Sequence, residues 1–223
     1  LNPVLRIDTQ MIEAVRAHRD VSVAGARDEA RDALGRVGIP SPEERLATYP
    51  HQLSGGMRQR VAIAIALLNK PDVIIADEPT TALDVTIQGQ ILFEIQKLCR
   101  ESGTALVWIT HDLSVVAGLA DHVAVMYAGK LVEVGPVDAV LDAPLHPYTR
   151  GLIDSVPSRN EKGLPLAQIR GMTPSLLTLD GGCAFRSRCD RADAACQMMP
   201  PLTRHAAGRA ARCVHPLATS LVR

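Results

Sequence analysis

Two kinds of apolar pattern alternate between residues 57 and 126. Short apolar runs of strand length lie at residues 72–76, 105–109 and 122–126. Stretches with apolar residues at helical spacing lie at about 57–69, at about 86–100 and from Asp112 onward. Apolar runs separated by helices are typical of a parallel sheet that is covered on both faces. The pattern therefore predicts an α/β fold, with the segment 129–135 as the arm of an antiparallel hairpin.

A purely helical pattern precedes the α/β part. Between residues 9 and 36 apolar and charged positions alternate at helical spacing, and Gly25 is expected to interrupt the helix. The segment 38–40 ends this section. A further short helix is predicted from Pro42, with Ser41 as its N-cap, because proline suits the first helical position and serine the cap.

Composition argues against two classes of function. The chain has 24 Lys plus Arg and 24 Asp plus Glu among 223 residues, so its charge gives no support for nucleic-acid binding. Aromatic residues make up 3% of the chain, which also argues against base stacking. No apolar stretch approaches the roughly 20 residues of a membrane-spanning helix. Contact with a membrane is therefore expected through a partner protein.

Two motifs carry the candidate chemistry. The run at residues 53–60 reads L-S-G-G-M-R-Q-R and opens an apolar helix, where backbone N–H groups and the helix dipole favour a phosphate. The strand at 73–76 ends in the carboxylates Asp77 and Glu78, of which one can hold a metal and the other can orient water. In this order and at this spacing, the motifs resemble the signature loop and the Walker B motif of ATP-binding cassette (ABC) ATPases.

Further segments extend the resemblance. The run A-L-D at 82–84 is similar to the D-loop of the family, and His111 follows a strand at the position of its switch histidine. The string at 81–88 is similar to the oligopeptide and dipeptide importer branch. The run H-P-Y-T-R at 146–150 is similar to the start of the C-terminal extension of that branch. The chain thus resembles the ATP-binding subunit of a bacterial peptide importer.

The resemblance implies a role for each motif residue. Glu78 would polarise the attacking water, and His111 would contact the γ-phosphate, so these two are the catalytic candidates. The nucleotide-binding candidates are Ser54, Gly55, Gly56, Gln59, Asp77 and Asp84. Asp77 would also hold Mg²⁺. Asp84 would link the two sites of a dimer, or alternatively it caps the helix that begins near Thr86.

The implied function is ATP hydrolysis coupled to the import of oligopeptides or dipeptides. Two ATPase subunits, identical or different, would sandwich two nucleotides, with each signature loop acting across the dimer. Their closure would move integral membrane permease subunits, which receive solute from a substrate-binding protein. The helices before the signature loop are the expected docking surface. The resemblance places such a subunit peripherally at the cytoplasmic face of the bacterial inner membrane.

No segment fits the Walker A pattern G-x-x-x-x-G-K-[ST]. The single Gly-Lys pair, Gly129-Lys130, is followed by leucine, and Ala124 stands where the first glycine would be. Residues 1–5 are similar to the stretch just after the Q-loop of the family. We therefore expect the chain to be the C-terminal part of a longer subunit and to be inactive alone.

Three parts are expected within the chain. Residues 1–56 would form a helical subdomain that ends in the signature loop. Residues 57–143 would form the C-terminal part of a RecA-like core, and residues 144–223 the C-terminal extension. Beyond Ser155 the chain is rich in Pro, Gly, Ser and Arg, so no regular structure is predicted there.

Four of the five cysteines gather in the last quarter of the chain, at Cys183, Cys189, Cys196 and Cys213. Their spacing does not match a C-x-x-C zinc site, and disulfides would be reduced in a cytosolic chain. Four thiolates suit zinc or an iron–sulfur cluster, and unligated thiols are the third alternative. The resemblance favours a [4Fe–4S] cluster. Cys99 is predicted to be a buried apolar residue outside this centre.

Other functions stay open at this point. An ABC importer for nickel or another solute has the same motifs, because solute specificity lies in other subunits. A non-transport ABC ATPase of DNA repair also carries an L-S-G-G loop, but its halves are separated by a coiled coil and no heptad run is present here. A partner that binds nucleotide without hydrolysis is disfavoured by Glu78 and His111. The histidines without a site assignment are His18, His51, His122, His205 and His215.

Overall fold

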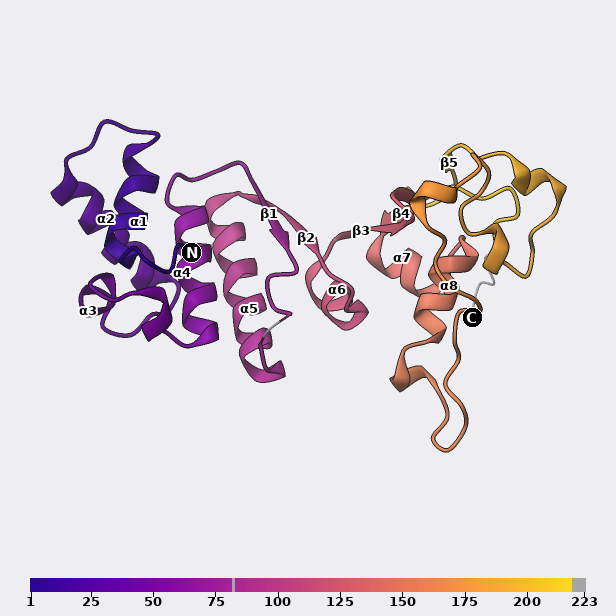
Figure 1. Cartoon of the computed structure of the whole chain (residues 1–223), viewed down its shortest axis with the longest axis horizontal. Coiled ribbons are helices and arrows are strands. Elements are labelled where there is room, and N and C mark those ends of the chain that lie inside the picture. Colours follow the sequence, from indigo (N-terminus) through magenta and orange to yellow (C-terminus); the bar gives the residue numbers. More distant parts are fainter. Residues whose placement is uncertain (82, 218–223) are drawn as a thin grey trace. The chain divides into compact units, whose positions relative to one another are not determined.

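The computed structural model describes residues 1–81 and 83–217, and Ala82 of the predicted D-loop lies outside the described residues. The chain forms two compact units, Leu1–His111 (unit 1) and Asp112–Arg223 (unit 2), and each is described by itself (Figure 1). No helix in the described part of the chain has both the length and the apolar character that a membrane span requires.

Unit 1 begins with the predicted helical part. Its elements are α1 (Ile7–Arg16), α2 (Val23–Arg36), α3 (Pro42–Leu46), the 3-10 turn η1 (Pro50–Gln52) and α4 (Gly55–Leu67). The expected break at Gly25 is wrong, because the hydroxyl of Ser22 caps α2 by accepting the N–H of Gly25 at 3.1 Å. Helix α3 begins at Pro42 as expected. Ser41 stands at the N-cap position, as predicted, but its φ is 48° and its side chain makes no cap hydrogen bond.

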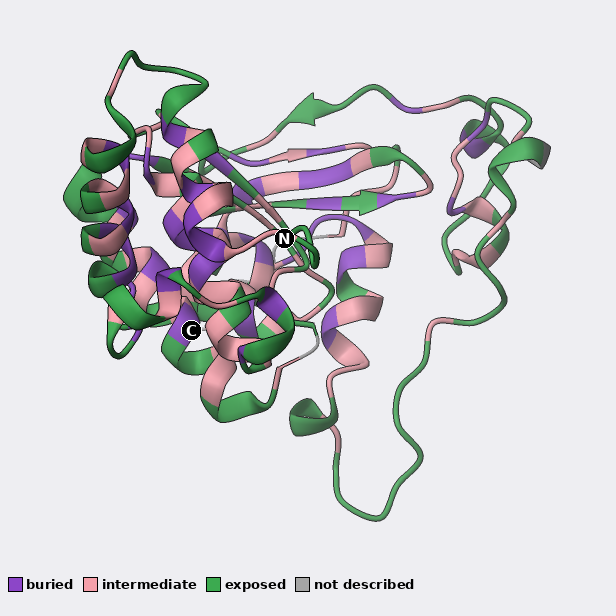
Figure 2. Cartoon of the chain, turned by 60° about the vertical axis from the view of Figure 1, so that its left-hand side comes forward, coloured by how far each residue is buried: buried purple, intermediate pink, exposed green. Residues whose placement is uncertain are grey.

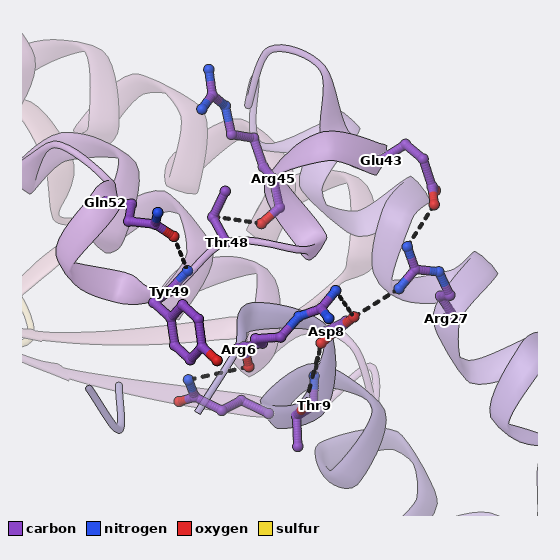
Figure 3. A network of polar contacts seen from close by, with 10 residues as sticks. Arg6, Asp8, Thr9, Arg27, Glu43, Arg45, Thr48, Tyr49 and Gln52 are labelled. Carbon is purple, nitrogen blue, oxygen red and sulfur yellow. Dashed lines mark hydrogen bonds and ion pairs between the residues drawn. The ribbon is translucent and has the colours of Figure 1, made fainter. Parts of the chain in front are cut away.

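Charged side chains tie the first three helices together (Figure 3). Arg27 on α2 donates to Asp8 on α1 at 2.8 Å and to Glu43 on α3 at 2.6 Å. Arg6 adds a contact to Asp8 at 3.0 Å. Because the side chain of Asp8 is only 12% exposed, its ion pairs are screened less by solvent than ordinary surface pairs. The network fixes the helices that lead to the signature loop.

The α/β part of unit 1 is a β-α-β unit of β1 (Val73–Asp77), α5 (Val85–Ser102) and β2 (Ala105–Ile109). The strands pair in parallel, as predicted, with Val73 opposite Ala105 and Asp77 opposite Ile109. One face of this pair joins the core formed with α4 and α5. The core residues from these elements include Val61, Ile63, Ile74, Ile91 and Ile95.

The opposite face of the β1–β2 pair is not covered. Val73, Ile75, Val107 and Ile109 are between 47% and 69% exposed, and all four lie on the face away from Ile74. Figure 2 colours buried residues purple and exposed residues green. The expectation of a sheet covered on both faces is therefore wrong for the described residues. A short apolar run gives the same sequence pattern whether one face or both faces of its strand are packed. The sequence therefore could not show that one face of the β1–β2 pair is uncovered.

Unit 2 contains a hairpin with short helices. Its main elements are α6 (Leu113–Leu119), β3 (His122–Tyr127), β4 (Lys130–Pro136), α7 (Val137–Asp142) and α8 (Pro147–Asp154). Strands β3 and β4 pair antiparallel, which confirms the predicted hairpin. In the described part of the chain β3 belongs to this hairpin sheet and not to the β1–β2 pair.

The segment after Ser155 packs back on the hairpin. It holds the 3-10 turns η2 (Pro157–Arg159), η3 (Leu176–Thr178), η4 (Arg186–Arg188) and η5 (Ala194–Gln197), with strands β5 (Thr203–Arg204) and β6 (Ala210–Ala211). Strand β6 pairs with β4, and the N–H of Arg212 donates to Val132 at 2.8 Å. Loops dominate, as the composition predicts, but these main-chain bonds give the cysteine-bearing loops a fixed support.

Candidate functional site

The predicted catalytic residues lie at the carboxyl ends of paired strands. Glu78 directly follows β1, and His111 comes two residues after β2. Because the strands are parallel and in register, both ends meet at one edge of the sheet. Nδ1 of His111 lies 3.1 Å from Oε1 of Glu78. The structure thus brings together two residues that are 33 positions apart in the sequence.

The backbone of Glu78 adopts an unusual conformation. Its φ is 44°, in the left-handed region that side chains other than glycine rarely occupy. The Glu78 N–H donates to the carbonyl of Ile109 at 3.0 Å, which continues the strand pairing by one residue. The hydroxyl of Thr81 donates to Oε2 at 3.1 Å. The surrounding hydrogen bonds hold this strained conformation in place.

Hydrogen bonds favour the ionised form of Glu78. Donation from His111 and then from Thr81 lowers the pKa of the carboxyl below its ordinary value. The side chains of Glu78 and His111 are 46% and 72% exposed, so the pair is accessible to a ligand and to water. An ionised, accessible carboxylate is what a base for water requires. Thr81 belongs to the sequence string at 81–88, but nothing in that string indicates its contact with Glu78.

The signature run forms the start of α4. Ser54 is the N-cap, and its hydroxyl accepts the N–H of Met57 at 3.2 Å. Gly55 and Gly56 occupy the first turn, whose N–H groups have no partners within the helix itself. A Cβ on Gly56 would lie 2.7 Å from a methyl group of Ile87, so only glycine fits the close approach to α5. This helix start has the form of an anion site.

The signature run and the carboxylates border one cavity of unit 1. The cavity has a volume of about 870 Å³. Its lining includes Gly55, Gln59, Asp77, Glu78 and Thr81. Asp77, the last residue of β1, is exposed and has its carboxylate available for a cation. Gly55 and Gln59 of the signature run thus border the same cavity as Asp77 and Glu78.

Asp84 has a clear structural role. It is the N-cap of α5, and its carboxylate accepts the N–H of Ile87 at 3.0 Å. This confirms the capping alternative, and a further role across a dimer is untested.

The four late cysteines border one small cavity of unit 2. The residues around it include Cys183, Cys189, Cys196, Cys213, His146, Pro147, Phe185, Arg186, Arg191 and His215. The N–H of Cys183 donates to the carbonyl of Cys196 at 3.0 Å. The N–H of His215 donates to the sulfur of Cys213 at 3.4 Å. Cys99 lies apart on α5, buried in the core of unit 1, as predicted.

Burial governs the acidity of these thiols. It raises the pKa of Cys183 and of Cys213 above the ordinary value, and repulsion from the neighbouring thiols acts in the same direction. All five cysteines are free. Without a cation in the cavity, Cys183 and Cys213 are therefore held in the protonated form at neutral pH.

Two residues that sequence reasoning left without a role adjoin the cysteines. The ligand atoms of Asp193, Cys196 and His215 all lie within 4.8 Å of one another. Nε2 of His215 lies 2.9 Å from Oδ2 of Asp193, and this contact lowers the pKa of Asp193. No motif marks the pair, because loop packing alone brings residues 193 and 215 together.

The arginines of the last segment have mixed roles. Of the six between positions 186 and 212, Arg186 and Arg191 border the cysteine cavity. Arg209 is buried and donates to the carbonyl of Ala143 at 2.6 Å. Arg212 donates to the carbonyl of Leu131 at 2.9 Å. Part of this basic character therefore supports the fold.

Comparison with family models finds two matches along the chain. Residues 2–81 match the model described as ABC transporter. Residues 132–196 match the model described as oligopeptide/dipeptide transporter, C-terminal region. The first match covers the signature run and the carboxylates, and the second covers the H-P-Y-T-R run and three of the late cysteines.

Curated relatives agree with both models. The chain is 46% identical over 217 residues to the oligopeptide transport ATP-binding protein OppD of Salmonella typhimurium, a match that covers 97% of this chain and 65% of the relative. It is 49% identical over 201 residues to the dipeptide transport ATP-binding protein DppD of Bacillus subtilis, covering 90% of this chain and 60% of the relative. The chain thus spans just under two thirds of the length of these relatives.

Solved structures support the same fold. A dimeric structure of a bacterial ABC transporter cassette aligns with a TM-score of 0.53 and 32% identity, over 61% of this chain and 59% of that one. A dimeric post-hydrolysis state of an ATP-binding cassette bound to ADP and Pi aligns with a TM-score of 0.55 and 30% identity, with the same coverage.

Proposed function

We infer that the chain belongs to the family of ATP-binding subunits of oligopeptide and dipeptide ABC transporters. On this premise we propose that it supplies the signature loop, the metal-binding aspartate and the catalytic base of a subunit that hydrolyses ATP to drive peptide import. The contact between Glu78 and His111, at 3.1 Å on one sheet edge, is the observation that carries the proposal.

The residues present suit Mg²⁺ and ATP. Asp77 offers an exposed carboxylate at the strand end, one residue before the base. Mg²⁺, when bound, neutralises negative charge on the transferred phosphate. Asp77 would hold the cation, while Glu78 accepts a proton from the attacking water. His111 donates to Glu78, lowers the pKa of its carboxyl and fixes the direction of its free lone pairs.

The signature loop has a different task. The first-turn N–H groups at Gly55 and Gly56 would bind a γ-phosphate held by the opposite subunit, with Ser54 and Gln59 beside them. The alignment with two dimeric cassette structures supports this arrangement. Asp84, as the cap of α5, would hold the adjoining loop in place near the dimer interface.

The wider assembly follows from family membership. We infer a second ATPase subunit, integral membrane permease subunits and a substrate-binding protein as partners, with peripheral placement at the cytoplasmic face of the inner membrane. The division into residues 1–56, 57–143 and 144–223 stays part of this proposal. Peptide is favoured over nickel as the cargo because the matched relatives bear peptide-transport names.

Uptake measurements test the proposal. The subunit would be expressed, with its neighbouring permease genes, in a strain that lacks peptide importers, and uptake of a labelled tripeptide and of Ni²⁺ would be compared. We expect ATP-dependent tripeptide uptake that Glu78→Gln abolishes and that Glu101→Gln, an exposed glutamate on α5, leaves intact. Nickel uptake without peptide uptake would overturn the cargo, and uptake that is unchanged in Glu78→Gln would overturn the catalytic role.

We further propose that Cys183, Cys189, Cys196 and Cys213 hold one metal centre, a [4Fe–4S] cluster. Four thiols on one cavity match the ligand set of such a cluster, and Arg186 and Arg191 offset its negative charge. The cavity encloses only about 10 Å³, so these loops must open to admit a cluster. A single tetrahedral zinc would instead hold all four sulfurs roughly 3.8 Å apart. Iron and sulfide analysis of anaerobically purified protein separates the two.

A further inference from the structure

The H-P-Y-T-R run has no part in the proposed ATPase chemistry, yet it reaches the cysteine cavity. His146 and Pro147 border this cavity together with all four late cysteines. The side chain of His146 is buried, with 1% exposure, and its ring centroid lies 5.9 Å from that of Phe185, two residues after Cys183. A buried imidazole in this position needs partners for both of its ring nitrogens.

The backbone determines the state of one ring nitrogen. His146 is the N-cap of α8, and its Nδ1 accepts the N–H of Tyr148 at 3.0 Å. The carboxylate of Glu133, which is fully buried, accepts the N–H groups of Leu145 and His146 at 2.7 and 2.9 Å. These bonds hold the residue in place. Because Nδ1 is an acceptor it carries no proton, so a neutral ring must carry its proton on Nε2.

The hydrogen-bond geometry keeps the ring neutral, because Nδ1 accepts the N–H of Tyr148 and cannot also carry a proton. With Nδ1 turned to the helix backbone, the edge of the ring that is left to border the cavity is the edge with Nε2. An N–H group beside sulfur ligands stabilises negative charge on them. Hydrogen bonds to the sulfurs are among the features that set the reduction potential of an iron–sulfur cluster.

We propose that His146 is a positioning residue of the cysteine centre, whose Nε2–H donates a hydrogen bond to a metal-bound cysteine sulfur and raises the reduction potential of the cluster. The inference rests on the metal centre proposed above, because the bond requires a thiolate. The donor favours the reduced state, which carries one more negative charge than the oxidised state. The H-P-Y-T-R run thereby has a chemical role beyond starting α8.

Two substitutions separate the donor from the helix cap. In His146→Asn the side-chain oxygen can still accept the N–H of Tyr148, but no donor reaches the cavity. In His146→Gln the longer amide places an N–H near the original Nε2, while the cap is lost. His122→Asn is the matched control, because His122 is an exposed histidine of the same unit. The full chain would be loaded anaerobically with iron and sulfide.

Metal content comes first and the midpoint potential second. We expect His146→Asn to load iron and sulfide but to show a more negative midpoint, His146→Gln to recover part of the shift, and His122→Asn to match the unchanged chain. A loaded His146→Asn protein with an unchanged midpoint overturns this inference alone. An unchanged chain that takes up neither iron nor sulfide overturns the cluster, and this inference with it.

Nuclear magnetic resonance on the unchanged sequence covers the case in which His146→Asn fails to fold or load. Ring nitrogens of the ¹⁵N-histidine-labelled chain would be observed with Zn²⁺ as a diamagnetic probe in the cysteine cavity. We expect the proton of His146 on Nε2, protected from exchange with solvent, and a shift of this resonance when Zn²⁺ binds. A proton on Nδ1, or an Nε2 resonance indifferent to the metal, overturns the inference.

Discussion

The candidate nucleotide site of unit 1 and the cysteine centre of unit 2 are positioned by different means. Glu78 and His111 follow paired parallel strands, so regular structure alone brings them to one edge. Between residues 183 and 213 the cysteines lie in loops and 3-10 turns. Individual bonds gather them, such as the one from the Cys183 N–H to the Cys196 carbonyl. In unit 1, paired strands thus present the exposed side chains of Glu78 and His111 to a ligand. In unit 2, loops surround the late cysteines, and we propose that these thiols need a metal.

The pKa of the reactive groups is also shifted in opposite directions at the two sites. Hydrogen bonds lower the pKa of Glu78, so this carboxylate is ionised before any ligand arrives. Burial raises the pKa of Cys183 and Cys213, so these thiols keep their protons until a metal displaces them. The first site is prepared in advance, and the second is completed by its ligand.

Loss of two cysteine ligands tests this contrast with the largest expected effect. We expect Cys183→Ser combined with Cys213→Ser to abolish metal binding, because a buried hydroxyl does not replace a thiolate. Cys99→Ser, in the other unit, should keep the full metal content. Metal analysis by mass spectrometry decides. Full metal content in the double variant would show that the thiols do not share one centre.

Substitution of Gly56 on α4 and of Gly89 on α5 should change the stability of unit 1 in opposite directions. Gly56→Ala should destabilise it by about 1–3 kcal/mol, because the added methyl meets Ile87 at 2.7 Å. Gly89→Ala should stabilise it by about 0.5–1 kcal/mol, since open space surrounds Gly89 in the interior of α5. Trp108, the single tryptophan, reports unfolding of this unit in urea. Equal effects of the two substitutions would remove the argument for close helix contact at the signature loop.

The ion network before the signature loop has a smaller effect. Arg27→Met should lower the free energy of unfolding of unit 1 by about 1 kcal/mol, because Asp8 is mostly buried and loses one partner. Arg31→Met is the matched control. Its partners Asp28 and Asp32 are exposed, so we expect a smaller change than in Arg27→Met. The same urea titrations measure both, and a larger effect at Arg31 would contradict the role given to burial.

Removal of the histidine partner should change the acidity of Glu78. In His111→Ala the carboxylate loses its main donor, so its pKa should rise toward the ordinary value. The ionised form then begins to be lost at a higher pH than in the unchanged chain. A ¹³C titration of the labelled carboxyl group measures this shift, with His122→Ala as the control. An unchanged or lower pKa in His111→Ala would disprove the proposed coupling.

Local patterns made the elements of unit 1 predictable. Helical spacing marked α4 and α5, and an apolar run marked β2 with its bounds at Ala105 and Ile109. The helix break was placed wrongly at Gly25, because glycine is tolerated in a first turn when the preceding cap, Ser22, is satisfied. The uncovered face of the β1–β2 pair could not be predicted, because the residues of a strand do not indicate how many layers pack against its sheet.

The sites were predictable to different depths. Glu78, His111 and the signature glycines stand in contiguous motifs at the ends of regular elements, so their identities and their proximity could both be predicted. The cysteines stand out as a group because four of the five lie within the last quarter of the chain. The approach of His146, Asp193 and His215 to them depends on packing of distant loops, for which no local spacing exists.

The steady-state ATPase rate of Glu78→Gln tests the central claim most directly. It would be measured in a subunit that supplies a Walker A loop in addition to these 223 residues, beside Glu101→Gln. We predict that Glu78→Gln still binds Mg-ATP but hydrolyses it roughly 100-fold to 10,000-fold more slowly, because an amide cannot accept the proton of the attacking water. Hydrolysis within a few-fold of the Glu101→Gln rate would contradict the assignment of Glu78 as the catalytic base.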